Sequence, residues 1–151
     1  DLITVAQAVH WFDIEKFNSE VKRVGKPNGI IALIGYELNN ITPEIDQIIR
    51  HFYSNIIGEY WSPERRHIQN RYQQIPFPFR ELETPEINNI KLWRFDHLIG
   101  YLNTWSAVHH FSDKNNYNPI SEIENDLREA WGNQEVRRVI FPIIFRAGRI
   151  K

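Results

Sequence analysis

The sequence predicts an α/β domain, and three observations support this fold class. Two short apolar runs rich in β-branched residues, 2–6 and 30–34, have the pattern of strands buried on both faces of a parallel sheet. The segment between them has the spacing of an amphipathic helix. A third β-favouring run, 136–145, follows several more helical segments. Strands that alternate with helices are typical of a layered α/β architecture.

The first element group is a strand–helix–strand unit. Asp13 is a good helix cap, and the apolar residues after it recur at spacings of three and four, at Ile14, Phe17, Val21 and Val24. Gly25 is predicted to end this helix in the left-handed conformation, and Pro27 prevents its continuation. The crossover should be right-handed, which makes the two strands parallel neighbours.

The middle of the chain contains two helix start signals. Thr42 and Ser62 each precede a Pro-Glu pair. The first predicted helix carries an apolar stripe as far as Tyr60, and the second, more polar helix runs through Arg71. We expect residues 39–78 to form a helical insertion or lid within a single domain of residues 1–151.

The remaining segments alternate again between strand and helix patterns. A strand over 79–82 ends before Pro85, residues 91–95 are ambiguous, and Asp96 caps a helix that reaches Val108. Ser121 and Glu124 have capping-box spacing and open a helix through Trp131. Pro142 implies a bulge or an edge position in the final strand.

Composition narrows the function classes. The 151 residues suit one domain, and 42% hydrophobic with 25% charged residues is ordinary globular usage. A net charge of −1 provides no overall electrostatic attraction to nucleic acid or to an anionic membrane. No apolar run is long enough for a membrane span. The 0 Cys exclude thiolate chemistry. We therefore expect a cytoplasmic protein without nucleic-acid or membrane partners.

The opening of the chain is unusual. It contains 0 Met and starts almost directly with the apolar run 2–6, whereas natural N-termini are usually polar and loosely ordered. The strand count is also low for a complete doubly wound sheet. We therefore expect the chain to be a fragment.

Polar and aromatic side chains follow both predicted parallel strands directly. Residues 7–11 come after the first strand and residues 35–38 after the second. In open parallel sheets, ligands bind beyond the carboxyl ends of the strands. The sequence therefore predicts one crevice that both segments face.

Several segments resemble class I S-adenosylmethionine-dependent methyltransferases, and most closely the small-molecule, trans-aconitate methyltransferase-like branch. The resemblance lies in residues 1–13, which end in His-Trp-Phe-Asp, in the turn 24–29, in the Trp-Ser segment 101–107 and in the final stretch 141–149. Gly25 and Asn28 depart from the Leu-Lys-Pro-Gly-Gly-like turn of that branch. The first stretch is specific only as a combination.

The resemblance implies that this chain is the C-terminal part of a Rossmann-like, seven-stranded sheet. The chain would contain strands four to seven of that sheet, the last of them antiparallel. The resemblance also implies S-adenosylmethionine as the cofactor. The Gly-rich cofactor loop and the acidic ribose-binding residue belong to strands one and two of such a sheet. Because neither motif occurs here, we expect the isolated chain to bind the cofactor weakly and to be inactive.

The resemblance also implies roles for particular residues. Ala6, Gln7, Ala8 and Trp11 would lie beside the cofactor. From the residues alone, Gln7 would instead lie in a solvated turn, and core packing is an equal alternative for Trp11. His10 would orient or deprotonate the methyl acceptor, or else satisfy a backbone carbonyl inside the protein. The small-molecule acceptor would bind among aromatic side chains, at Tyr36, Trp61, Tyr101 and Trp105.

Two other sets of residues, three arginines and four histidines, are weaker candidates for ligand or metal sites. Arg65, Arg66 and Arg71 could bind a carboxylate, but a solvated helix face accounts for them better. The histidines at 51, 67, 109 and 110 lack the spacing of metal ligands, so we expect no metal site.

Two functions of different classes follow. The first is methyl transfer from S-adenosylmethionine to a small molecule. The alternative is a non-catalytic interaction module that retains part of this fold and forms a homo-oligomer through an exposed sheet edge.

Overall fold

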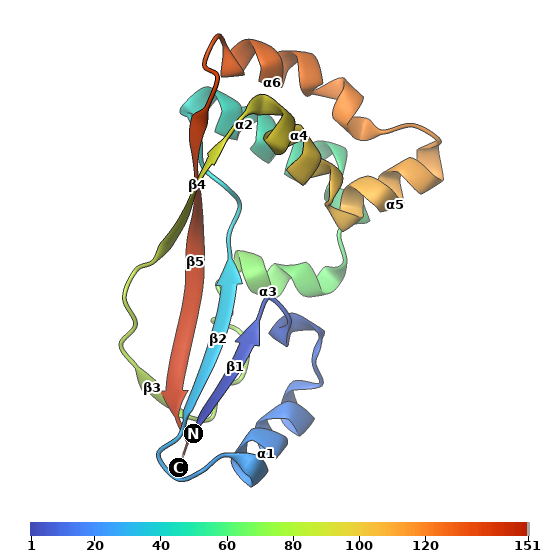
Figure 1. The fold of residues 1–151 in the computed structure, drawn as a ribbon. Helices are drawn as coiled ribbons and strands as arrows, with labels where there is room; N and C mark the ends of the chain where they lie inside the picture. Colours follow the sequence, from blue (N-terminus) through green and yellow to red (C-terminus); the bar gives the residue numbers. More distant parts are fainter. Residues whose placement is uncertain (151) are drawn as a thin grey trace. The chain divides into compact units, whose positions relative to one another are not determined.

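The computed structural model describes residues 1–150, which begin with a strand–helix–strand unit and continue with runs of helices between the later strands (Figure 1). The strands are β1 (Leu2–Ala6), β2 (Ile30–Tyr36), β3 (Arg80–Leu82), β4 (Asn88–Trp93) and β5 (Arg137–Arg149). The α-helices are α1 (Ile14–Val24), α2 (Pro43–His51), α3 (Arg66–Gln69), α4 (Phe95–Asn103), α5 (Ser106–Asn115) and α6 (Glu124–Trp131). Short helical turns are η1 (Val9–Trp11), η2 (Phe52–Ile56), η3 (Gly58–Tyr60), η4 (Pro63–Arg65) and η5 (Pro119–Glu122).

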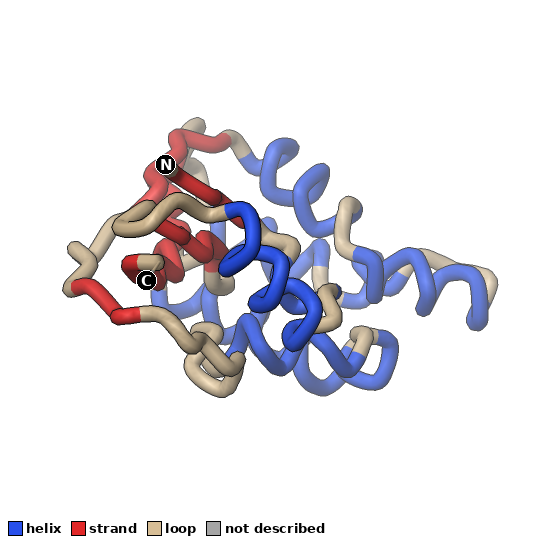
Figure 2. The backbone as a smooth tube through the Cα atoms, turned by 90° about the horizontal axis from the view of Figure 1, so that it is seen from below, coloured by secondary structure: helices blue, strands red, loops and turns tan. Residues whose placement is uncertain are grey.

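The chain divides into two compact units. Unit 1 comprises Asp1–Leu38, Pro63–Asn89 and Phe141–Lys151, and unit 2 comprises Asn39–Ser62 and Ile90–Ile140. Unit 1 contains most of the sheet, and unit 2 is largely helical; strand and helix are distinguished by colour in Figure 2. The residues expected to form an insertion, 39–78, are therefore shared between the two units.

The sheet of unit 1 has the strand order β1-β2-β5-β3. β1 and β2 are parallel, in register from Leu2 opposite Ile30 to Ala6 opposite Ile34. β5 is antiparallel to both of its neighbours, β2 and β3, and β4 also pairs with it. The predicted α/β class and the antiparallel last strand are confirmed.

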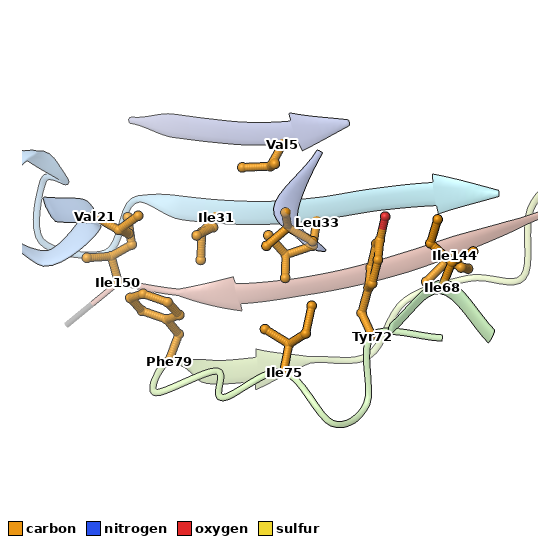
Figure 3. Close-up of a cluster of buried hydrophobic side chains, with 11 residues drawn as sticks. Val5, Val21, Ile31, Leu33, Ile68, Tyr72, Ile75, Phe79, Ile144 and Ile150 are labelled. Atoms are coloured by element: carbon orange, nitrogen blue, oxygen red, sulfur yellow. The ribbon is translucent and has the colours of Figure 1, made fainter. Parts of the chain in front are cut away.

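The core of unit 1 lies on one face of this sheet (Figure 3). Val21 of α1 packs there with side chains from the strands, from η1, from α3 and the segment after it, and from the end of the chain. They are Val5, Val9, Ile31, Leu33, Ile68, Tyr72, Ile75, Phe79, Ile144 and Ile150. Such burial of apolar area is the main stabilising contribution to a fold of this size.

Burial of residues 2–6 on both faces is a wrong prediction. Val5 is 7% exposed, but Leu2 is 63% exposed, and Thr4 and Ala6 are exposed as well. Alternate residues of a strand point to opposite faces, and only the Val5 side of β1 contacts the core. Among residues 1–150, no strand pairs with the outer edge of β1.

Gly25 does not adopt the left-handed conformation that its position predicts. Its φ is −71°, and Asn28 takes the positive φ of this turn, at 65°. Glycine is required at 25 for another reason: an added Cβ would lie 2.6 Å from the Ile150 Cδ1 atom and 2.6 Å from the Val21 carbonyl oxygen. The glycine at position 25 thus allows the end of α1 to pack closely against Ile150, the residue after β5.

Several predicted helices are shorter or more broken than expected. α2 ends at His51, and the apolar stripe continues through a π turn and a 3₁₀ turn. The helix expected to run from Asp96 to Val108 is interrupted at Thr104 and Trp105, and α5 extends to Asn115. Asn118, not Ser121, caps the turn before α6 by accepting a hydrogen bond from the Ile120 N–H.

The ambiguous residues 91–95 and the final strand also differ from the prediction. Residues 91–93 belong to β4, and β5 continues to Arg149 rather than ending at 145. Pro142 directly precedes Ile143, the first residue of β5 that is in register with β2. Its carbonyl accepts a hydrogen bond from the Glu37 N–H at 2.9 Å, so the proline fits where the ladder needs only an acceptor.

Candidate functional site

Gln7 connects the carboxyl ends of β1 and β2 by two hydrogen bonds. Its backbone has a φ of 51°, a conformation that is uncommon outside glycine. Its N–H donates to the Ile34 carbonyl at 2.7 Å, and its side-chain Oε1 accepts from the Tyr36 N–H at 3.1 Å. The side chain therefore extends the strand pairing by one step beyond the last backbone partner.

The turn η1 follows immediately and separates two aromatic side chains. His10 is buried, with 7% exposure, whereas Trp11 is 60% exposed. Their ring centroids are 5.0 Å apart. Ala8 precedes the turn, and Ala6 is exposed at the end of β1. Trp11 thus offers an aromatic surface to solvent while His10 faces the protein interior.

His10 lies in an electrostatic setting that favours the neutral imidazole. Burial lowers the pKa of His10 below its ordinary value, and the charges of Arg65 and His67 lower it further, while Glu64 opposes them. Its Nδ1 atom is buried and has no hydrogen-bond partner within residues 1–150. A neutral imidazole can accept a proton at neutral pH.

On the buried side, the ring of His10 lies against that of Tyr72. The two rings are stacked, with centroids 6.3 Å apart and an interplanar angle of 21°. Tyr72 is fully buried, and burial raises the pKa of its hydroxyl to about 12. Sequence reasoning missed Tyr72, because it follows a short polar helix and no periodic pattern distinguishes it.

The predicted acceptor residues fall into both units. In unit 2, Trp105 is 5% exposed and its ring centroid lies 5.5 Å from that of Trp61 and 5.7 Å from that of Tyr101. Tyr53 joins this cluster at 4.9 Å from Trp61 and 5.8 Å from Trp105. Tyr36 belongs to unit 1, where its ring meets the edge of Phe141 at 5.8 Å.

The aromatic cluster of unit 2 contains two indole N–H groups, those of Trp61 and Trp105. The Trp61 Nε1–H donates to the Tyr53 carbonyl at 3.1 Å. The Trp105 Nε1 atom is buried, and the described part of the chain offers it no hydrogen-bond partner. The structure therefore brings the rings of Trp61, Tyr101 and Trp105 together, while their role in acceptor binding stays a prediction.

Residues 1–150 contain neither a cluster of metal ligands nor a membrane-spanning helix. No group of three or more His, Asp or Glu side chains in that range could hold a metal ion. None of its helices combines the length and apolar character needed to cross a membrane.

Comparison with known proteins places this geometry in context. No protein-family model matches the chain. A Dictyostelium discoideum protein, provisionally named a methyltransferase, is 35% identical over 150 residues, which are 95% of this chain and 57% of that protein. An uncharacterised methyltransferase of Schizosaccharomyces pombe is 23% identical over 145 residues, covering 95% of this chain and 56% of the relative.

A solved structure extends the comparison to three dimensions. The structure of a protein from Anaeromyxobacter dehalogenans, provisionally titled a type II methyltransferase, superimposes with a TM-score of 0.91 at 41% identity. The match covers 99% of this chain and 64% of that one. The chain therefore has a methyltransferase fold and spans somewhat more than half the length of the proteins it matches.

Proposed function

We propose that the protein transfers a methyl group from S-adenosylmethionine to a small-molecule acceptor. The observation that carries the proposal is the corner formed by Gln7, η1 and Tyr36 at the carboxyl ends of two parallel strands. Open α/β sheets bind their ligands beyond such strand ends. The methyltransferase names of the relatives and the fold shared with the A. dehalogenans structure support it.

The residues at this corner fit the cofactor. Ala6 and Ala8 are small, and Ala6 is exposed, so the backbone there can be approached closely. The exposed ring of Trp11 offers a face to a positively charged sulfonium by cation–π attraction. Gln7 holds the corner in shape through its bond to the Tyr36 N–H. When bound, S-adenosylmethionine supplies a reactive methyl group to an oriented nucleophile.

The contribution of the chain to catalysis is then orientation and, for some acceptors, proton removal. His10 is neutral and buried, so it can take a proton from an acceptor that must lose one. An acceptor that is already anionic needs no base. Within unit 1, Tyr36 at the end of β2 would contact the acceptor and help to exclude water. The aromatic cluster of Trp61, Tyr101 and Trp105 in unit 2 is a separate candidate for acceptor binding.

Calorimetry with S-adenosylhomocysteine on the full-length protein tests the proposal. We expect measurable binding, and weaker binding by the Trp11→Ala variant. Tyr117→Ala serves as a matched control, because Tyr117 is an exposed aromatic of unit 2, at 47% exposure. Absence of binding heat at high ligand concentration would exclude the transferase function.

An interaction module remains the second candidate, and one observation favours it. β1 is an edge strand of the described sheet, and its Leu2 side chain is 63% exposed. Unpaired strand edges invite pairing with another chain. Sedimentation of the full-length protein decides the matter: a stable dimer that the Leu2→Lys substitution dissociates supports the module, and a monomer at all concentrations argues against it.

A further inference from the structure

The hydroxyl of Tyr72 is a buried polar group without a partner. The side chain is 0% exposed, and the structure of residues 1–150 provides no hydrogen bond to its Oη atom. Nearly all buried polar side-chain atoms in proteins are hydrogen-bonded, because an unpaired one lowers stability. Phenylalanine would fill the same space without this penalty, so the hydroxyl needs another explanation.

The backbone that carries Tyr72 is also strained. Arg71 has a φ of 51° and Tyr72 a φ of 60°, so two consecutive residues with side chains occupy the left-handed region. Such strain persists only where surrounding contacts impose it, and it gathers at functional sites.

The contacts that impose this conformation are visible. The Tyr72 N–H donates to the His67 carbonyl at 2.7 Å, and the Tyr72 carbonyl accepts from Arg146 Nη1 at 2.8 Å. Arg71 forms an ion pair with Glu37, directly after β2. The turn at Arg71 and Tyr72 is therefore fixed from both the helix before it and the sheet beside it.

Gly35 makes room for the hydroxyl at the end of β2. A Cβ added to Gly35 would lie only 2.7 Å from the Tyr72 Oη atom and 3.0 Å from its Cε2 atom. Figure 3 shows the ring standing over the core face of the sheet with its oxygen directed toward β2. A side chain at residue 35 would prevent this approach.

His10 contributes the second buried polar atom without a partner. Its ring is stacked with that of Tyr72, and its Nδ1 atom shares the lack of a hydrogen bond within the described residues. The two unpaired atoms belong to stacked rings, at the strand ends to which the cofactor is assigned. Both atoms are covered in this structure, so the role proposed next requires η1, which carries His10, to move aside when a ligand binds.

We propose that Tyr72 Oη and His10 Nδ1 together bind the acceptor oxygen that receives the methyl group. This inference rests on the proposed function. The Tyr72 hydroxyl donates a hydrogen bond to that oxygen. An oxygen lone pair forms the new O–CH₃ bond while the S–CH₃ bond of the sulfonium donor breaks, and the bonding electrons remain on sulfur. A hydroxyl acceptor passes its proton to His10 Nδ1, whereas a carboxylate acceptor has no proton to pass.

The test compares the full-length wild type with Tyr72→Phe. Methyl-labelled S-adenosylmethionine is supplied with a panel of phenols, aliphatic alcohols, carboxylic acids, amines and thiols. We expect kcat/KM for the oxygen acceptors to fall roughly 10–100-fold in the variant. Its melting temperature should be equal to or above that of the wild type, and its affinity for S-adenosylhomocysteine should be unchanged. Tyr117→Phe, an exposed site, is the matched control and should transfer at the wild-type rate.

The pH profile separates the two kinds of oxygen acceptor. Transfer to a hydroxyl should require neutral His10 and decline as the pH falls, whereas transfer to a carboxylate should not depend on His10 in this way. Unchanged transfer in Tyr72→Phe, or transfer confined to nitrogen or sulfur acceptors, would overturn the inference. So would a lower melting temperature of the variant, since the hydroxyl would then have a structural partner. Failure of the wild type to bind S-adenosylhomocysteine would instead refute the proposed function.

Discussion

The side-chain oxygen of Gln7 accepts a hydrogen bond from the backbone N–H of Tyr36, 3.1 Å away. The bond joins the residue that follows β1 to the last residue of β2, at the strand ends where the ligand is predicted to bind. Because Gln7 also has a positive φ, its position is determined by the strand pairing and not by local preference. The side-chain amide of Gln7 therefore helps to fix the geometry of the corner before η1, together with the bond from its backbone N–H to the Ile34 carbonyl.

Replacing Gln7 by Ala should loosen this corner. The Tyr36 N–H would lose its acceptor, which should lower the free energy of unfolding by about 1–3 kcal/mol. Binding of S-adenosylhomocysteine should weaken as well. Denaturant unfolding and calorimetry measure the two effects, and the exposed Gln73→Ala is the control. Equal stability of Gln7→Ala and wild type would show that the bond does not hold the strand ends.

Replacing Gly35 by Ala should destabilise unit 1. The new methyl group would lie 2.7 Å from the Tyr72 hydroxyl, which cannot move freely inside the core. Overpacking of this kind costs about 1–3 kcal/mol. Gly100→Ala is a sharp control, because Gly100 lies in α4 with nothing within 4 Å of an added Cβ. That variant should gain about 0.5–1 kcal/mol. Urea denaturation of both proteins checks the contrast, and equal effects would contradict it.

The burial of His10 should make stability depend on pH. Its folded pKa is lowered, so below about pH 6.5 the unfolded chain binds more protons at this position than the folded chain. The contribution of His10 to stability is thus complete above that pH and is lost as the pH falls toward the folded pKa.

Melting temperatures of the wild type and His10→Gln between pH 5 and pH 8 measure this effect. The wild type should lose stability more steeply than the variant below about pH 6.5. The difference between the two proteins at pH 8 serves as the reference, because the imidazole is neutral in both states there. Parallel curves across the whole range would show that His10 is not desolvated.

The aromatic cluster of unit 2 should depend on Trp105. This side chain is 5% exposed and contacts the rings of Tyr53, Trp61 and Tyr101. Trp105→Ala should lower the free energy of unfolding by about 3–5 kcal/mol. Trp105→Phe should lower it less, because it keeps a ring and removes an unpaired N–H. Chemical denaturation monitored by circular dichroism measures both, and a negligible effect of Trp105→Ala would contradict the packing described here.

Local patterns were sufficient to predict the parallel strand pair and α1. Asp13 caps α1 by accepting a hydrogen bond from the Lys16 N–H, as its residue type and position predict. The spacing of the apolar residues also places Val21 in the core. The exposure of Leu2 could not be predicted, because an apolar run does not reveal whether both faces are covered.

The site was predictable only where its residues follow a strand. Gln7 and His10 come directly after β1, and Tyr36 ends β2, so the rule about carboxyl ends locates them. Tyr72 lies at the same strand ends because its backbone adopts a strained turn and because Gly35 has no side chain in the way of its ring. Gly35 and Tyr72 are more than thirty residues apart in the sequence. A contact of this kind depends on tertiary packing, which no periodicity in the sequence encodes.

The position of the cofactor is the central claim, and backbone amide NMR of the full-length protein tests it most directly. Addition of S-adenosylhomocysteine should shift the amide signals of residues 6–11 and of Tyr36, and leave those of α6 unchanged. Shifts confined to unit 2, for example around the groove of about 540 Å³ lined by Phe95, Arg128 and Trp131, would contradict the claim. A spectrum that S-adenosylhomocysteine does not change would contradict it as well.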